Sequence, residues 1–334
     1  MDIALNIAYL LFGLCLLVKG SDYFVDSASE IAKRFGISEM IIGLTLVAFA
    51  TSLPEWVASL IAALRDPATL NGQNPTDLAL GNVIGSNITN IGLVLGVCGL
   101  MVKDGLKAKG SFLQRDIPLM IILSSLSWFF SFKGAGVASW EGAILFVIFM
   151  AVLIHTVRNI AKSEDKSEDE SDASDEDEDL SEASNLKLAG FTIGGLAALL
   201  VGSNLLVEGA SAIAITAGIS EAVVGITMVA FGTSVPELAT SITAAKRGKH
   251  AMLLGGIIGS NTANLAVVLG TVAILVPVDV DPSLIEFQFP VMLGFAMALW
   301  VFMLSGKIFR WQSALLLTGY LAFTASLFFP QAGV

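Results

Sequence analysis

Two glutamates in this chain stand beside hydroxyl residues and a proline inside long apolar runs. Glu55 ends the sequence ATSLPE, and Glu237 ends GTSVPE. In both copies an alanine, a threonine, a serine and the glutamate are spaced 0, 3, 4 and 7, so each set shares one helical face. These sets are Ala48, Thr51, Ser52 and Glu55 in the first copy, and Ala230, Thr233, Ser234 and Glu237 in the second.

The proline within each motif should release a backbone oxygen next to these side chains. Pro54 and Pro236 have no amide hydrogen, so the carbonyls of Ala50 and Gly232 lose their intrahelical partners. Within a membrane, freed carbonyls persist where they are buried in protein or line a cavity. Carbonyl, hydroxyl and carboxylate oxygens together suit a hard cation such as Ca²⁺ or Na⁺.

A second pair of short motifs repeats in the same manner. GSNITN, ending at Asn90, matches GSNTAN, ending at Asn264. In each motif the asparagine shares a helical face with a serine four residues before it, Ser86 or Ser260. A lone serine or asparagine usually hydrogen-bonds its own helix or a neighbouring one. Because both motifs occur twice, we favour the interpretation that their neutral oxygens complete a coordination shell.

The two glutamates are harder to explain as structural residues. A charge at the centre of a bilayer costs several kcal/mol. Neither Glu55 nor Glu237 has a basic residue nearby in the sequence that could neutralise it. Cation binding is therefore the favoured interpretation of both.

The composition is that of an integral membrane protein. Hydrophobic residues make up 55% of the chain and charged residues only 14%, whereas soluble domains carry about 25% charged residues. The mean hydropathy is +0.79. Apolar stretches of about 20 residues, the length that crosses a hydrocarbon core of about 30 Å, recur along the whole chain.

The net charge of −11 comes from one segment. Ser163–Glu182 holds 12 acids and one lysine, and the rest of the chain is neutral. Rich in Ser, Glu and Asp, this segment predicts a disordered linker rather than a packed element. We therefore divide the chain into a first repeat (1–160), an acidic linker (161–186) and a second repeat (187–334).

Ten membrane-spanning helices fit the apolar pattern, five in each repeat. The first and sixth exceed the length that a perpendicular crossing needs. The predicted spans are Ile3–Ala32, Ile37–Ala63, Leu78–Val102, Ile117–Phe132, Trp140–Val157, Leu188–Ala217, Ile219–Ala245, Met252–Val276, Phe287–Leu304 and Trp311–Phe329.

Basic residues predict the orientation of these spans. If both termini are extracellular, the cytoplasmic loops hold 15 Lys and Arg residues and the outer loops only Arg65 and Lys133. The positive-inside rule favours this arrangement, with the acidic linker in the cytoplasm. The expected location is the plasma membrane.

The two repeats must then insert in opposite orientations. Ile37–Glu55 and Ile219–Glu237 are identical at 12 of 19 positions, yet each repeat has five spans, an odd number. The sequence thus predicts an all-α membrane protein built from two inverted five-helix repeats. Transporters of this design bind their ions near the midplane, where broken helices of the two repeats meet.

At these residues the chain resembles the sodium/calcium exchangers of the cation/calcium antiporter superfamily, especially the compact prokaryotic members. ATSLPE and GTSVPE, each followed by GSN-x-x-N, are similar to the two alpha repeats of that family, placed here at 43–96 and 225–270. The resemblance implies the exchanger fold and exchange of Ca²⁺ for Na⁺ by alternating access. In this cycle the first and sixth spans would slide across the remaining bundle.

The resemblance also implies roles for the candidate residues. Glu55 and Glu237 would be the central carboxylates shared between Ca²⁺ and Na⁺, and the Thr51 and Thr233 carbonyls would contact Ca²⁺. The flanking Na⁺ sites would be lined by Ser52, Ser234, Ser86 and Ser260 and by the carbonyls of Ala48 and Ala230.

One position departs from the family pattern. The second repeat of the family often ends in Ser-x-x-x-Asp, whereas this chain has Asn264, matching Asn90. The predicted core site therefore carries two acids and a formal charge of −2. One Ca²⁺ or two Na⁺ would balance it, and a third Na⁺ would leave an excess positive charge. The resemblance still implies the coupling of three Na⁺ to one Ca²⁺, which this count of charges does not itself establish.

Several alternatives remain open at this point. The antiporter could be coupled to H⁺ or K⁺, although the Gly-Asn-x-x-Glu signature of proton-coupled relatives is missing from both repeats. A cation channel would more naturally be an oligomer, whereas this chain is expected to work as a monomer. An enzyme is disfavoured because the sequence contains no His-Glu-x-x-His motif and no nucleophile with a plausible base. We expect no cofactor and no nucleic-acid partner.

Overall fold

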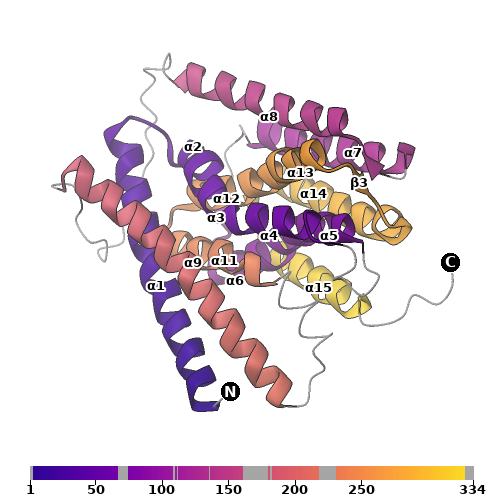
Figure 1. The fold of residues 1–334 in the computed structure, drawn as a ribbon. Coiled ribbons are helices and arrows are strands. Elements are labelled where there is room, and N and C mark those ends of the chain that lie inside the picture. Colours follow the sequence, from indigo (N-terminus) through magenta and orange to yellow (C-terminus); the bar gives the residue numbers. More distant parts are fainter. Residues whose placement is uncertain are drawn as a thin grey trace.

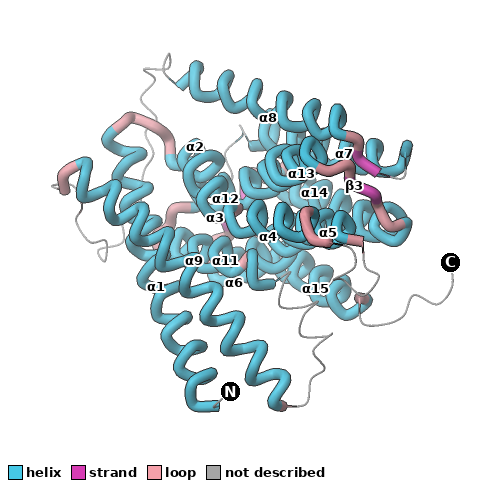
Figure 2. The backbone as a smooth tube through the Cα atoms, viewed as in Figure 1, coloured by secondary structure: helices cyan, strands magenta, loops and turns pink. Residues whose placement is uncertain are grey.

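Helices account for nearly all of the chain that the structure, a computed structural model, describes (Figure 2). The described residues are 3–66, 74–107, 110, 112–134, 136–160, 180, 183–217 and 231–327. Most of the predicted acidic linker and the first part of the predicted span Ile219–Ala245 lie outside them.

Each predicted span of the first repeat corresponds to a helix or to a run of joined helical segments (Figure 1). Three of these runs contain π-helical turns, which insert an extra residue and occur frequently at functional sites. The elements are α1 (Ile3–Arg34), α2 (Glu39–Ile42), η1 (Gly43–Val47), α3 (Ala48–Thr51), α4 (Leu53–Ala63), α5 (Pro75–Thr89), η3 (Asn90–Val94), α6 (Leu95–Met101), η4 (Phe112–Asp116), α7 (Ile117–Gly134) and α8 (Ser139–Ile160).

The described part of the second repeat follows the order of the first. A π-helical turn begins at Asn264, just as one begins at Asn90 in the first repeat. The elements are α9 (Asn185–Thr216), α11 (Val235–Lys246), α12 (His250–Ala263), η5 (Asn264–Val268), α13 (Leu269–Leu275), η6 (Leu284–Gln288), α14 (Phe289–Met303) and α15 (Arg310–Ser326).

Six helices in the described part of the chain are long and apolar enough to cross a membrane. Taken as one span, the bent pair Glu39–Thr51 and Leu53–Ala63, whose parts meet at 41°, is a seventh. The other three predicted spans correspond to α8, to α15 and to Ile219–Ala245, of which the structure describes α11. The chain is thus an all-helical membrane protein, as predicted.

Helices α1 and α9, the first helices of the two repeats, touch through their backbones. They are 32 residues long each and lie side by side across the bundle (Figure 1). A Cβ added to Gly13 would lie 2.7 Å from the Gly202 carbonyl oxygen, and one on Gly202 would lie 2.8 Å from that of Gly13. Gly20 and Gly195 repeat this reciprocal contact at 2.9 and 2.8 Å. We call these four glycines the glycine seam.

Helix α12 lies at the centre of the bundle and packs directly on α2, η1 and α3 (Figure 1). A Cβ on Gly255 would lie 2.5 Å from the Met40 carbonyl oxygen, and one on Gly259 would lie 2.7 Å from that of Leu44. Such distances are possible only for glycine, which lets helix backbones approach closely in a membrane. The central helix of one repeat is thereby pressed against the broken span of the other.

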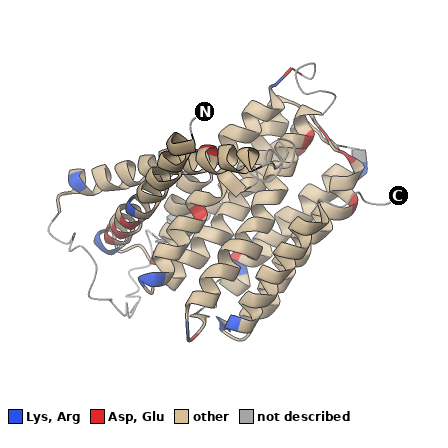
Figure 3. Ribbon diagram, turned by 90° about the horizontal axis from the view of Figure 1, so that it is seen from below, with Lys and Arg blue, Asp and Glu red and all other residues tan. Residues whose placement is uncertain are grey.

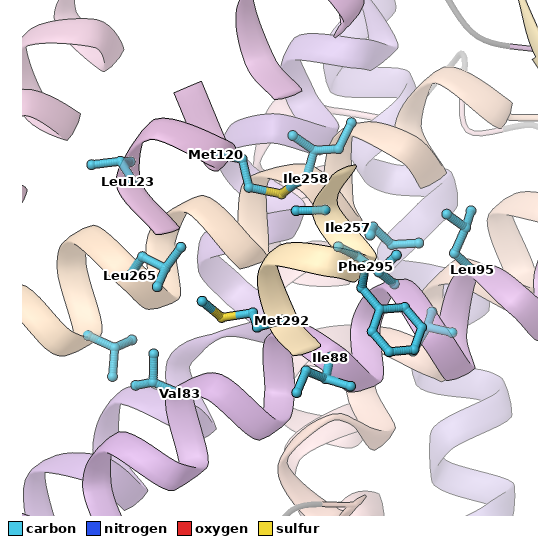
Figure 4. Close-up of a cluster of buried hydrophobic side chains, with 14 of the residues drawn as sticks. Val83, Ile88, Leu95, Met120, Leu123, Ile257, Ile258, Leu265, Met292 and Phe295 are labelled. Atoms are coloured by element: carbon cyan, nitrogen blue, oxygen red, sulfur yellow. The ribbon is translucent and has the colours of Figure 1, made fainter. Parts of the chain in front are cut away.

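Apolar side chains from several helices fill the space around α12. Met120 of α7, Ile258 of α12 and Met292 of α14 are fully buried together (Figure 4). Leu95 of α6 and Leu265 of η5 extend this core. The core fixes the positions of α5 and α12, which carry the two GSN motifs.

Two short antiparallel ladders join loops of the two repeats. The strand β1 (Leu106–Lys107) pairs with β4 (Lys307–Ile308), and β2 (Gly136–Val137) pairs with β3 (Val278–Asp279). The sequence did not predict them, because two residues are too few for an alternating pattern to appear.

Charged residues lie mostly near the ends of the helices (Figure 3). One buried group ties α1 to the end of α11. The Asp26 carboxylate lies 2.9 Å from Nη2 of Arg247 and 3.5 Å from Nζ of Lys249. Asp26 therefore has a structural role in holding the two helices together.

Candidate cation site

The two candidate glutamates each lie in the first turn of a half-helix. Ser52 has φ −80° and ψ 1°, and Ser234 has φ −90° and ψ 3°, so the helix is interrupted at both serines. A proline follows at the start of α4 and of α11. Glu55 and Glu237 come next, near amide groups whose dipole favours a negative charge.

Both carboxylates are buried without a hydrogen bond. The exposed fraction is 0% for Glu55 and 3% for Glu237, and none of the four carboxylate oxygens has a hydrogen-bond partner. Buried charges are normally paired or coordinate a metal ion, because an isolated buried ion is costly. The two glutamates therefore have the environment of cation ligands and not that of a structural ion pair.

Most unpartnered buried polar atoms in the described part of the chain belong to the predicted site. Eleven buried side-chain nitrogen or oxygen atoms have no hydrogen-bond partner, and eight of them are on predicted site residues. All eight are oxygens. They are both carboxylate oxygens of Glu55 and of Glu237, Oγ of Ser52 and of Ser234, and Oδ1 of Asn90 and of Asn264.

Each glutamate faces hydroxyl groups of the other repeat. The Glu55 carboxylate interacts with the Thr233 and Ser234 side chains and is repelled by the charge of Glu237. The Glu237 carboxylate interacts with the Thr51 side chain. These hydroxyls lie near the carboxylates without forming hydrogen bonds of regular geometry to them. The two predicted faces therefore meet in one place.

The serines of the GSN motifs adjoin the same faces. The Ser86 hydroxyl lies 3.4 Å from that of Thr233, and the Ser260 hydroxyl lies 3.5 Å from that of Thr51. Ser260 also donates to the Ala48 carbonyl oxygen at 3.4 Å. Again each contact joins one repeat to the other.

The asparagines of the GSN motifs lie where these segments pack together. Helix α4, with Glu55, packs against η5, which begins at Asn264, and α11, with Glu237, packs against η3, which begins at Asn90. Both asparagines are fully buried. Of the twelve predicted site residues, only Ala230 lies outside the described residues.

One freed carbonyl has found another partner. The sequence predicted that Pro236 would release the Gly232 carbonyl, and the Ser203 hydroxyl of α9 donates to that oxygen at 2.7 Å. The equivalent serine of α1, Ser21, instead contacts the Thr243 hydroxyl at 2.8 Å. The long first helices of both repeats thus reach the broken span of the second repeat, in different ways.

Asn82 adjoins the site and was missed by the sequence analysis. Its Nδ2 donates to the backbone carbonyl of Glu55 at 3.2 Å and to the Ser59 hydroxyl at 2.9 Å. Its Oδ1 accepts from the Thr233 hydroxyl at 3.4 Å. Gly256 stands at the equivalent place in the second GSN segment, so Asn82 gave no repeat signal.

A cavity of about 10 Å³ adjoins Glu237, with room for about one water-sized particle. Thr51, Thr240 and Ser241 supply polar groups to its wall, and the rest of the wall is mostly apolar residues of α1 and α12. Among the described residues, no group of three or more His, Cys, Asp or Glu could hold a metal ion. The arrangement thus offers two carboxylates and many neutral oxygens.

Comparison with known proteins gives a consistent result. A model of the sodium/calcium exchanger protein family matches residues 5–158 and 187–329, once in each half. The sodium/calcium exchanger MaX1 of Methanosarcina acetivorans is 33% identical over 98% of this chain and 99% of its own. An uncharacterized membrane protein of Methanocaldococcus jannaschii is 35% identical over 97% of this chain and 98% of its own.

A solved structure has the same fold. The sodium-calcium exchanger NCX_Mj, soaked with 10 mM Na⁺ and 10 mM Sr²⁺, matches with a TM-score of 0.82 and 32% sequence identity. The match covers 98% of this chain and 100% of that one.

Proposed function

Since this chain belongs to the sodium/calcium exchanger family and is a membrane cation antiporter of that type, we propose that it exchanges Ca²⁺ for Na⁺ at a site centred on Glu55 and Glu237. One observation carries the proposal: eight buried oxygens on residues of both repeats have no hydrogen-bond partner. A hard cation satisfies such oxygens, and Ca²⁺ takes six to eight of them.

The remaining candidate residues take the roles that the resemblance implies. The Thr51 and Thr233 carbonyls would contact Ca²⁺, and the serine hydroxyls would contact Na⁺ in flanking positions. The Ala48 and Ala230 carbonyls and the Asn90 and Asn264 side chains complete the set. Their neutral oxygens support repeated exchange, because they bind cations without adding the charge that would slow release.

The orientation is part of the proposal. We place both termini outside the plasma membrane and residues 161–186 in the cytoplasm, in agreement with the distribution of basic residues in the loops. The chain would work as a monomer, because both halves of the site come from one polypeptide.

Flux measurements test the function directly. Purified protein is reconstituted into vesicles loaded with Na⁺, with K⁺ or with choline, and uptake of radioactive Ca²⁺ is followed after dilution into Na⁺-free medium. We expect rapid uptake only with internal Na⁺, since outward Na⁺ movement drives Ca²⁺ entry. Equal uptake in all three preparations would indicate a channel, and uptake driven by a K⁺ or H⁺ gradient alone would change the coupling ion.

A single substitution tests the charge of the site. Asn264→Asp should lower the Na⁺ concentration that half-maximally drives exchange by several-fold and make the dependence on Na⁺ steeper. A third acid gives the site a formal charge of −3, which can balance one more monovalent cation. The measurement is the initial rate of Ca²⁺ uptake against internal Na⁺ concentration, and an unchanged curve would remove Asn264 from the site.

A further inference from the structure

We propose that Asn87 and Asn261 are positioning residues that orient the side chains of Asn90 and Asn264, so that their oxygens and not their nitrogens face the transported cation. The inference rests on the proposed function, because orientation matters only where a cation binds. Asn87 and Asn261 belong to the two GSN motifs but lie off the face that carries the serine and the second asparagine.

The first half of the arrangement starts from a backbone carbonyl. Nδ2 of Asn261 donates to the carbonyl oxygen of Asn87 at 3.2 Å. That oxygen can only accept, so the amide of Asn261 must point its nitrogen there and its Oδ1 elsewhere. Oδ1 of Asn261 accepts from Nδ2 of Asn90 at 3.0 Å. The oxygen of Asn90 is thereby turned away and is buried without a partner.

The second half mirrors the first with the repeats exchanged. Nδ2 of Asn87 donates to the carbonyl oxygen of Asn261 at 3.2 Å and approaches Sδ of Met292 at 3.7 Å. Oδ1 of Asn87 accepts from Nδ2 of Asn264 at 3.1 Å. Oδ1 of Asn264 is left buried without a partner, like that of Asn90.

Each orientation is fixed by the helix backbone. Turning the Asn261 amide around would set its oxygen against the Asn87 carbonyl and its nitrogen against the nitrogen of Asn90. Two hydrogen bonds would be lost together among side chains that are fully buried, where an unmade bond is costly. The backbone carbonyl of Asn87 therefore fixes the orientation of the Asn261 amide, and Asn261 in turn fixes the orientation of the Asn90 amide.

The orientation matters because the two ends of a side-chain amide have opposite properties. Its oxygen is a good ligand for Ca²⁺ or Na⁺, whereas its NH₂ group only donates hydrogen bonds and repels a cation. A carboxylate has no such difference between its ends. An aspartate at this position would therefore need no orienting partner, whereas an asparagine does. In this chain Asn87 is the partner that orients Asn264.

The effect of Asn87→Ala on the KM for Ca²⁺ should depend on which residue occupies the position of Asn264. With Asn264 present, Asn87→Ala frees the Asn264 amide to present its nitrogen and should raise the KM for Ca²⁺ about 10- to 100-fold, the usual effect of losing a residue that orients a metal ligand. In the Asn264→Asp background, the Asn87 oxygen faces a carboxylate that cannot donate to it. There, Asn87→Ala should leave the KM for Ca²⁺ unchanged or lower it.

The experiment measures the KM and maximal rate of Ca²⁺ uptake for the four proteins of this cycle, with Thr262→Val as a matched control. Thr262 is the buried neighbour of Asn261, and its hydroxyl bonds only the Ile258 carbonyl of its own helix, at 2.7 Å. The control should keep the wild-type KM. An equal rise of KM on Asn87→Ala in both backgrounds would overturn the proposal and leave Asn87 a packing residue.

The symmetric cycle of Asn261→Ala and Asn90→Asp replaces the first if Asn87→Ala does not fold. The comparison uses Ca²⁺ dependence alone. If Ca²⁺ uptake proves independent of Na⁺, the proposed exchange is refuted. The KM values for Ca²⁺ would still show whether Asn87 orients Asn264.

Discussion

Glu55→Gln is expected to abolish Na⁺-driven Ca²⁺ uptake while leaving the protein folded. Glutamine keeps the size of the side chain but removes one of the two charges at the site. At about 4 Å from a cation and an effective dielectric constant of about 20, one unit charge contributes about 4 kcal/mol, or roughly a thousandfold in affinity. Glu237→Gln should have the same effect. Uptake by both variants is measured in Na⁺-loaded vesicles.

Glu39→Gln is the matched control. Glu39 begins the same broken span but is not one of the candidate site residues. Its carboxylate accepts a hydrogen bond from the Ser29 hydroxyl at 2.7 Å, unlike the carboxylate of Glu55. Its variant should exchange ions at nearly the wild-type rate. Glu55→Gln removes the repulsion between the buried carboxylates of Glu55 and Glu237, so it should not destabilise the fold. We expect this variant to elute as a single species in size-exclusion chromatography in detergent. Wild-type uptake by either site variant would refute the site.

Gly255→Val should prevent the two repeats from packing together. Even a Cβ at this position would lie 2.5 Å from the Met40 carbonyl oxygen, and a backbone atom cannot move aside as a side chain can. Overpacking of a close-packed core typically costs about 1–3 kcal/mol and occasionally more. We expect a large loss of monodisperse protein in size-exclusion chromatography, and a lower thermal midpoint for what remains.

The comparison for that prediction is Gly294→Val in α14. A Cβ at Gly294 would have no atom within 4 Å, so this variant has the same change of helix propensity without the clash. It should yield as much folded protein as the wild type. Similar losses for the two variants would mean that propensity, and not the contact of α12 with α2, controls folding.

The sequence predicts a candidate site because its signal is chemical and occurs twice. Glu55 and Glu237 are costly in an apolar run, and without a basic partner nearby a cation is the simplest reason for both. The helical repeat then grouped the hydroxyls with the carboxylates. These arguments need only local spacing and the inverted arrangement of the repeats.

The parts that were missed depend on contacts between distant segments. Asn82 binds the Glu55 carbonyl from a helix that begins a dozen residues after α4 ends, and no periodicity marks such a contact. Asn87 and Asn261 did carry a repeat signal, yet helical spacing placed them off the site face. The role that we propose for them rests on the hydrogen bonds that α5 and α12 exchange. Ser203, likewise, reaches Gly232 from another span.

The glycine seam packs α1 and α9 so closely that we expect the two helices to move together as one rigid unit. In the most apolar stretch of each helix only 22% and 28% of residues are buried, so lipid surrounds most of this pair. Sliding it along the bundle would exchange lipid contacts over most of its surface and would break the Asp26–Arg247 ion pair that ties α1 to α11. Because the seam joins a helix of each repeat, we expect both halves to switch together. We therefore expect no state in which one half opens while the other stays closed, the kind of state through which an exchanger would leak ions.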